Sequence, residues 1–165
     1  MSQATVAQAQ VQTRWLDEQE QLAWRTYLAA SKAIGEAIDS QLQRDGDIPH
    51  IYYEILVRLS EAPDRQLRMS ELADRSLSSR SRLSHAVARL EERGWVARRA
   101  CPNDGRGMLA QLTDSGMSAI EDLAPGHVTA VRTQIFDRLT PEQVQQLRAI
   151  SEAILGGPSA FLTPL

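Results

Sequence analysis

The fold is decided by residues 67–113, which read LRMSELADRSLSSRSRLSHAVARLEERGWVARRACPNDGRGMLAQLT. The first half holds two short stretches whose apolar residues recur at helical spacing, separated by a serine-rich turn. In the second half, the turn-forming residues 102–105 lie between a strand that begins at Trp95 and a return strand over 108–112. The order helix, turn, helix, strand, loop, strand predicts a winged helix-turn-helix.

Serines and a glycine mark the predicted ends of these two helices. Ser70 is expected to cap the first helix and Ser78 or Ser79 the second, because a serine hydroxyl accepts bonds from the free N–H groups of a helix start. Gly94 follows the second helix, where a left-handed residue is usually needed. The side chains expected to pack inward from the second helix are Leu83, Ala86, Val87 and Leu90.

The opposite face of the second helix carries small hydroxyl, basic and imidazole side chains. This combination suits the major groove of DNA, because small residues allow close approach and arginine pairs with guanine or phosphate. The candidate DNA contacts around this helix are Ser78, Ser79, Arg80, Ser81, Arg82, Ser84, His85 and Arg89. Arg82 is the first choice for a base edge, whereas Arg80 is either a phosphate contact or a neighbour of the cap. The alternative is an ordinary solvated helix face.

The hairpin adds candidates for contact outside the major groove. Arg106 lies near the tip, where an arginine can enter the minor groove, and Asp104 is placed to orient its guanidinium. Arg98 and Arg99 alternate along the first strand, so only one can face DNA while the other makes a salt bridge. Arg98 is retained as the candidate, through a phosphate or as support for the wing. The alternative for Arg106 is a surface arginine in a turn.

Charge is distributed unevenly along the chain. Between Arg65 and Arg106 ten arginines stand against five acidic residues, a net charge of +5, whereas the remaining 8 basic and 16 acidic residues leave −8. The overall charge of −3 hides this difference. A basic segment inside an acidic chain predicts a polyanionic partner.

Three segments of this region resemble the MarR family of bacterial transcriptional regulators. They are Leu90–Val96 with Arg98, Pro102–Gly107, and Leu112–Gly116. The resemblance extends over about 15–155. It implies an obligate homodimer with a winged helix in each subunit and a role in controlling transcription. Many members release DNA when small, often phenolic or anionic, ligands bind.

The sequence predicts a mainly α fold with a small β-hairpin wing, in four parts. These are a flexible segment 1–13, an N-terminal dimerisation helix 14–46, a winged helix-turn-helix 47–115, and C-terminal dimerisation helices 116–165. The outer helices hold more apolar surface than the winged part needs, so we expect a second copy to cover them. Two recognition helices would then lie about 34 Å apart, on a pseudo-palindromic operator.

Several helix boundaries outside the winged part are also predicted. A long helix is expected from about Trp15 to Leu42, ended by Asp45–Asp47, and a second is expected to start at Pro49. A third is expected after Thr113 or Asp114, with a kink or break at Pro125–Gly126. Thr140–Gln143 has the pattern of a capping box, with proline at the first helical position. Gly156–Pro158 is expected to stop the last helix, before an apolar tail over 160–165.

Aromatic residues in the first half of the chain admit two interpretations. They are Trp15, Trp24, Tyr27, His50, Tyr52 and Tyr53. Together they can line a cleft for a phenolic or aromatic anion. The other interpretation is that Trp24, Tyr27 and Tyr52 are core residues at helical spacing and that Trp15 lies in the dimer interface.

Catalytic, metal and redox chemistry have little support. Nucleophile, paired-carboxylate and phosphate-loop motifs are absent, and we expect no cofactor and no enzymatic activity. His50, His85 and His127 are expected to lie far apart, so no metal site is predicted. Cys101 stands near two arginines, which suits a redox switch, but the family's thiol sensors carry their cysteine near the first helix and a passive strand residue is the simpler interpretation.

The leading hypothesis is a cytoplasmic, dimeric, sequence-specific repressor that binds double-stranded DNA and is relieved by a small ligand. A second hypothesis is the same regulator without ligand sensing. A third is a winged helix used for protein interaction, which the basic recognition face argues against. No membrane span is expected, because no apolar run approaches about 20 residues.

Overall fold

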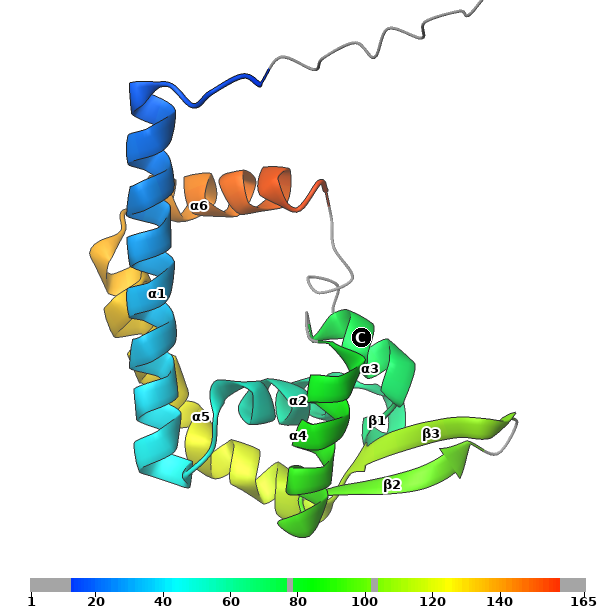
Figure 1. Ribbon diagram of the computed structural model, residues 1–165. Helices are drawn as coiled ribbons and strands as arrows, with labels where there is room; N and C mark the ends of the chain where they lie inside the picture. The colour runs from blue at the N-terminus through cyan, green and yellow to red at the C-terminus, as the bar shows by residue number, and fades with distance from the viewer. Residues whose placement is uncertain (1–12, 77–78, 102–103, 158–165) are drawn as a thin grey trace, which may run out of the picture. The chain divides into compact units, whose positions relative to one another are not determined.

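The computed structural model describes residues 13–76, 79–101 and 104–157, with only the backbone described for 104–106. Its helices and strands are, in order, α1 (Glu18–Gly46), α2 (His50–Glu61), η1 (Pro63–Arg65), β1 (Gln66–Arg68), α3 (Met69–Arg75), α4 (Arg80–Glu92), β2 (Val96–Cys101), β3 (Asp104–Leu112), α5 (Asp114–Gln134), η2 (Phe136–Arg138) and α6 (Pro141–Ile154) (Figure 1). The prediction of a mainly α fold with a small β element is confirmed. The chain forms two units, 1–33 and 34–165, which are described separately.

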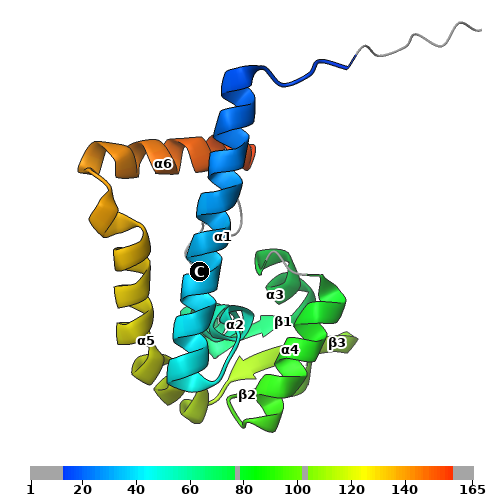
Figure 2. The same cartoon turned by 60° about the vertical axis from the view of Figure 1, so that its left-hand side comes forward.

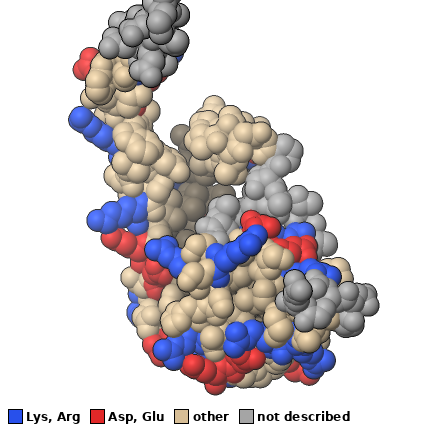
Figure 3. Space-filling model, turned by 45° about the vertical axis from the view of Figure 1, so that its right-hand side comes forward, with Lys and Arg blue, Asp and Glu red and all other residues tan. Residues whose placement is uncertain are grey.

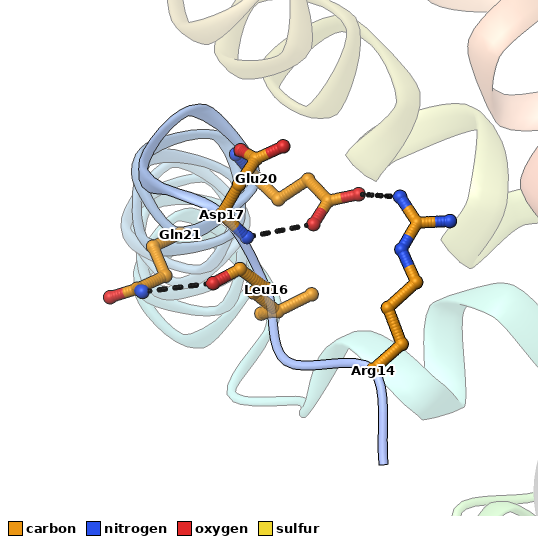
Figure 4. A network of polar contacts seen from close by, with 5 residues as sticks. All are labelled: Arg14, Leu16, Asp17, Glu20 and Gln21. Atoms are coloured by element: carbon orange, nitrogen blue, oxygen red, sulfur yellow. Dashed lines mark hydrogen bonds and ion pairs between the residues drawn. The ribbon is translucent and has the colours of Figure 1, made fainter. Parts of the chain in front are cut away.

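The described part of the first unit contains the beginning of α1, which is fixed by a reciprocal cap. The Asp17 backbone N–H donates to Glu20 Oε2 over 2.9 Å, and the Glu20 N–H donates to Asp17 Oδ1 over 2.8 Å. Arg14 adds an ion pair with Glu20, 3.1 Å long, as Figure 4 shows. The helix therefore starts at Glu18 and not at Trp15, because Asp17 and Glu20 satisfy the free N–H groups at that point. Its last residue is Gly46, which lies within the predicted end at Asp45–Asp47.

The second unit is built on one hydrophobic core. Helix α2 packs against α3, α4, α5 and the sheet, as the two ribbon views show (Figures 1 and 2). The largest side chains that are fully buried there are Leu42, Ile48, Ile55, Leu56, Leu59, Leu72, Leu83, Val87, Leu90 and Val96. The predicted inward stripe of α4 is confirmed, since all four of its members are buried. Burial of this stripe leaves the other face of α4 exposed.

Both ends of α4 follow the predicted chemistry. Ser79 is the N-cap, and its hydroxyl accepts the Arg82 backbone N–H over 3.3 Å. At the other end, Gly94 adopts a φ of +74° and donates to Glu91 O, while the Trp95 N–H donates to Leu90 O over 3.0 Å. This pair of bonds is a Schellman motif, which satisfies the last carbonyls of the helix and turns the chain into β2.

The expected cap of α3 is wrong. The helix starts at Met69, its N-cap is Arg68 without a side-chain hydrogen bond, and Ser70 lies inside the first turn. The reason is the neighbouring strand: β1 pairs with β3 up to Arg68, opposite Leu109, so the helix begins as soon as the ladder ends. Leu77, which was expected on the inner face, and Ser78 lie outside the described residues.

The sheet has three strands in the order β1-β3-β2, where the sequence predicted a two-stranded hairpin. Strand β1 pairs antiparallel with β3 in the register Leu67↔Ala110. Strand β3 starts at Asp104, four residues before the predicted return, and the register shifts between Ala100 and Cys101. We call α2–α4 with this sheet the winged module.

The C-terminal helices have the two predicted caps, and α5 is not broken. Thr113 caps α5 by accepting the Gly116 N–H over 3.0 Å. Thr140 and Gln143 form the capping box of α6, with Pro141 in the first turn. Helix α5 is continuous through Pro125 up to Gln134, so of the predicted kink or break only the break is excluded. Gly156 and Gly157 adopt positive φ after α6 ends, whereas 158–165 and the segment 1–12 lie outside the described residues.

Over the part of the chain that the structure describes, none of the helices has the length and apolar composition needed to cross a membrane.

Candidate nucleic-acid interface

The outer face of α4 presents the side chains that the sequence predicted for DNA. Ser81, Arg82, Ser84 and His85 are all exposed. Among the described residues, Arg82 has no acidic partner, so its guanidinium is available to an incoming acceptor. This face sits on a rigid base, because the opposite side of the same helix is fully buried in the core.

A hollow of about 400 Å³ lies beside the first turns of α4. Its rim includes Arg80 and Ser84 from α4, Arg98 from β2, and Arg68 and Ser70 at the start of α3. Leu83 and two methionines form its apolar wall. The sequence pattern did not indicate that Arg68 and Ser70 line this hollow, because they reach it only through the packing of α3 against α4.

Arg98 is held by an acid of α4. Its Nε donates to Glu91 Oε2 over 2.8 Å, its Nη2 lies 2.6 Å from the same oxygen, and its backbone N–H donates to Glu91 Oε1 over 3.2 Å. These bonds lower the pKa of the Glu91 carboxyl. Arg98 therefore joins the wing to the recognition helix, and Arg99, its neighbour, is exposed.

The excess of arginine does not translate directly into a basic surface. Among the described residues of the window 65–106, at least five arginines form ion pairs, namely Arg65 with Asp114, Arg75 with Glu71, Arg89 with Glu92, Arg93 with Asp47, and Arg98 with Glu91. Figure 3 shows acidic and basic side chains interspersed over this part of the molecule. The count of ten arginines in this window therefore overstates the number of cations that are free to meet a polyanion.

Arg89 lies at the far end of α4 from the serine-rich start. It forms a 2.7 Å ion pair with Glu92, and the two residues line a hollow of about 430 Å³ together with Tyr52. The hydrogen bond and the charge of Glu92 raise the pKa of Arg89. Its contact with DNA stays a prediction.

The wing tip is described only in part. The backbone of residues 104–106 belongs to β3, so Asp104 and Arg106 lie on the wing as predicted. Their side chains lie outside the described part of the structure, as does Ser78 entirely. The proposed contact of Arg106 with the minor groove and its orientation by Asp104 stay predictions.

Arg93 is a structural arginine that sequence reasoning did not single out. Its Nη1 donates to Gly46 O over 3.2 Å and its Nη2 donates to Asp47 O over 2.7 Å. The guanidinium also lies over the Trp95 ring, 5.1 Å from the centroid. Arg93 thus connects the end of α4 to the end of α1. Its two partners lie far away in the sequence, Gly46 by 47 positions and Asp47 by 46 positions.

The aromatic residues predicted to line one cleft separate into two groups. In the first unit, Trp24 and Tyr27 stack with ring centroids 6.1 Å apart and are 52% and 53% exposed, and Trp15 is 84% exposed. The interpretation of Trp24 and Tyr27 as core residues of this chain is therefore wrong, whereas the assignment of Trp15 to a dimer interface stays a prediction. In the second unit, Tyr53 is buried whereas Tyr52 is half-buried beside Arg89.

The expectation that the histidines lie far apart is also wrong for one pair. The ring centroids of His50 and His127 are 5.9 Å apart, and the Tyr53 ring lies 4.5 Å from that of His127. Only the packing of α2 against α5 brings these residues together. His85 stands apart on the exposed face of α4.

The described residues build no metal site, and the role of Cys101 stays a prediction. Within the described ranges, no group of three or more histidine, cysteine or acidic side chains is placed to hold a metal ion. Cys101 is a free cysteine, and it is buried at the end of β2.

The comparisons with known proteins agree with this geometry. A family model described as MarR family matches residues 47–107. The crystal structure of Sco3205, a MarR family transcriptional regulator from Streptomyces coelicolor in complex with DNA, is 52% identical and has a TM-score of 0.85, with 88% of this chain and 91% of that chain covered. AbsC, another MarR family transcriptional regulator from the same organism, is 40% identical with a TM-score of 0.80, over 87% of this chain and 99% of that chain. The transcriptional repressor MprA of Escherichia coli is 27% identical over 83% of this chain and 77% of its own length.

Proposed function

Because the chain belongs to the MarR family, we propose that it is a transcriptional regulator that binds double-stranded DNA and represses from a pseudo-palindromic operator. The observation that carries the proposal is the exposed face of α4. Serine, arginine and histidine side chains stand there on a helix whose other face is buried. The most similar structures described above include a regulator bound to DNA, which supports the same use of this face.

Each candidate side chain has a role that its position supports. Arg82 is exposed near the start of α4, and its guanidinium can donate a pair of hydrogen bonds to the edge of a guanine in the major groove. Arg80 stands at the rim of the arginine- and serine-lined hollow, which suits a backbone phosphate. Arg106, at the wing, is assigned to the minor groove, where negative potential attracts arginine.

We propose a homodimer because the outer helices expose apolar side chains. On α1 these are Leu22, Trp24, Tyr27 and Leu28, and on α6 they are Leu147, Ile150 and Ile154. An exposed apolar stripe on a helix marks a surface that a partner covers. In this proposal, 14–46 and 116–165 make the dimer, 47–115 binds DNA, and two α4 helices lie about 34 Å apart on one face of the duplex.

The decisive experiment is a selection of genomic fragments by the purified protein at about 0.15 M salt. An enriched inverted repeat with half-sites about ten base pairs apart is the expected result. The Arg82→Ala variant should lose the enrichment, whereas Arg132→Ala should keep it, since Arg132 lies on α5 and pairs with Asp137. A folded dimer that enriches no sequence would overturn the proposal and favour the winged helix as a protein-interaction module.

Relief by a small ligand is a separate proposal. The hollow beside Tyr52 is also lined by Arg89 and Arg93, which are paired with Glu92 and Asp47 of the same lining, so a phenolic ligand that contacts Tyr52 suits it better than an anion. A thermal-shift panel of phenolic acids tests it. A regulator without ligand sensing follows if no compound raises the melting temperature or releases bound DNA. Because the proposed partner is operator DNA, we also propose that the protein acts in the bacterial cytoplasm.

A further inference from the structure

The contact between α2 and α5 contains a stacked pair of histidines beside a buried tyrosine. His50 is the first residue of α2, and His127 lies in the middle of α5. The two rings are inclined by 27° with centroids 5.9 Å apart, and the Tyr53 ring is 4.5 Å from the His127 ring. The DNA-binding residues described above do not include this pair.

The surroundings of both imidazoles favour their neutral form. Nδ1 of His127 is shielded from solvent and has no hydrogen-bond partner among the described residues. His50 stands at the positive end of the α2 dipole, which disfavours a cation. Burial lowers the pKa of both rings, and the charge of His50 lowers the pKa of His127 further.

The nearby acidic and phenolic groups do little to offset these effects. Asp39 of α1 accepts the His50 backbone N–H over 2.8 Å and favours protonation of His50, but it is outweighed by burial. Asp45 of α1 is hydrogen-bonded to Gln41. Glu54, one turn beyond His50 on α2, faces the opposing charge of Arg58, and its pKa is raised by burial. Burial also raises the pKa of Tyr53, which therefore stays uncharged.

Helix α2 packs against α5 on one side and against the recognition helix α4 on the other. We propose that His50 and His127 form an acid-sensitive joint between α2 and α5, and that protonation of either ring opens the joint and weakens the binding of DNA. The effect on DNA rests on the function proposed above. The opened chain takes up more protons than the closed one as pH falls below the ordinary histidine value of 6.5, so the contact is fully stabilising above that value and is lost below it.

The test compares the full chain with its His50→Phe/His127→Phe variant, in which the rings still stack but cannot be protonated. Operator affinity and melting temperature are measured from about pH 8 to pH 5.5 at constant ionic strength. His85 is present in both proteins, so its own protonation cancels in the ratio of their affinities. The unsubstituted chain should lose affinity relative to the variant by up to about tenfold per pH unit for one proton taken up. Its melting temperature should fall in the same range, while that of the variant changes less.

Parallel pH profiles of the two proteins would overturn the proposal. If the double phenylalanine variant does not fold, His50→Gln/His127→Gln serves instead, and the same loss of pH dependence is expected because neither position can then be protonated. Absence of DNA binding at pH 8 would refute the proposed function but not the joint. The joint is then judged from the melting temperatures and from an NMR titration of the two imidazoles, where ring pKa values at or above 6.5 would refute it.

Discussion

Glu91 Oε2 lies 2.6 Å from Arg98 Nη2, and Glu91 Oε1 accepts the Arg98 backbone N–H over 3.2 Å. One carboxylate thus fixes both the side chain and the backbone of the first residues of the wing to the last turn of α4. The Gly94 turn brings the two residues together, since it reverses the chain between them. The orientation of the wing relative to the recognition helix depends on this ion pair.

Replacing Glu91 by glutamine should destabilise the protein slightly, by less than about 1 kcal/mol, because the pair is partly exposed. The folded-state pKa of Glu91 is lowered, so its contribution is complete above the ordinary glutamate value and is lost as pH falls through the lowered one. Urea unfolding at a series of pH values should therefore show the difference at pH 7 and its disappearance in acid. Glu92→Gln is the control, since Glu92 pairs with Arg89 through side chains alone. An equal effect of both variants would remove the special role of Glu91.

Gly116→Ala should destabilise the protein severely. A Cβ at this position would lie 2.2 Å from the Trp95 carbonyl oxygen, which is backbone and cannot move aside cheaply. Overpacking of this kind typically costs about 1–3 kcal/mol or more. Gly35→Ala is the matched control, because nothing lies within 4 Å of its Cβ and alanine favours the helix by about 0.5–1 kcal/mol. Thermal melts that rank the two variants in the opposite order would contradict this interpretation.

Ser79→Ala should destabilise the protein by about 1 kcal/mol, because the Ser79 hydroxyl caps α4. Ser70→Ala should be close to neutral in stability, because Ser70 lies inside α3 and does not cap it. Chemical unfolding of both variants distinguishes the two serines. A larger loss from the Ser70 substitution would mean that α3 is capped as the sequence alone suggested.

Arg82→Ala and Arg80→Ala should affect DNA binding in different ways. Loss of a base contact by Arg82 should reduce discrimination between operator and random DNA by about 1–3 kcal/mol. Loss of a phosphate contact by Arg80 should weaken binding to both kinds of DNA and reduce the salt slope by about one. Titrations of both duplexes at several salt concentrations separate these outcomes. Identical changes for the two variants would show that neither residue reads the bases.

The sequence alone predicted the features that depend on residues within a single helix or at its ends. The buried stripe of α4, its Ser79 cap, the left-handed Gly94 and the Thr140–Gln143 box were all predicted. Strand β1 was missed because three residues are too few for a period-2 pattern, and its pairing partner Gln111 is 45 positions from Gln66. Because β1 extends to Arg68, α3 starts at Met69 and Ser70 is not its cap.

At the candidate interface, too, the sequence predicted some features and not others. The sequence located α4 and its outer face, because the helical repeat places apolar and polar residues on opposite sides. It could not say which arginines are free, since Arg65 and Arg93 find their acidic partners 49 and 46 positions away. The ion pairs of α4 with its neighbours likewise form only when the chain folds.

By itself, then, the sequence determined the order of the helices and the hairpin, the caps at Ser79, Thr113 and Thr140, and the face that α4 exposes, because these depend on residues within a few positions of one another. Only the tertiary structure decided the third strand, the pairing of the arginines and the stacking of His50 on His127. These features depend on contacts between residues that are distant in the chain. Their partners are selected by packing around the core, which no local pattern of residues encodes.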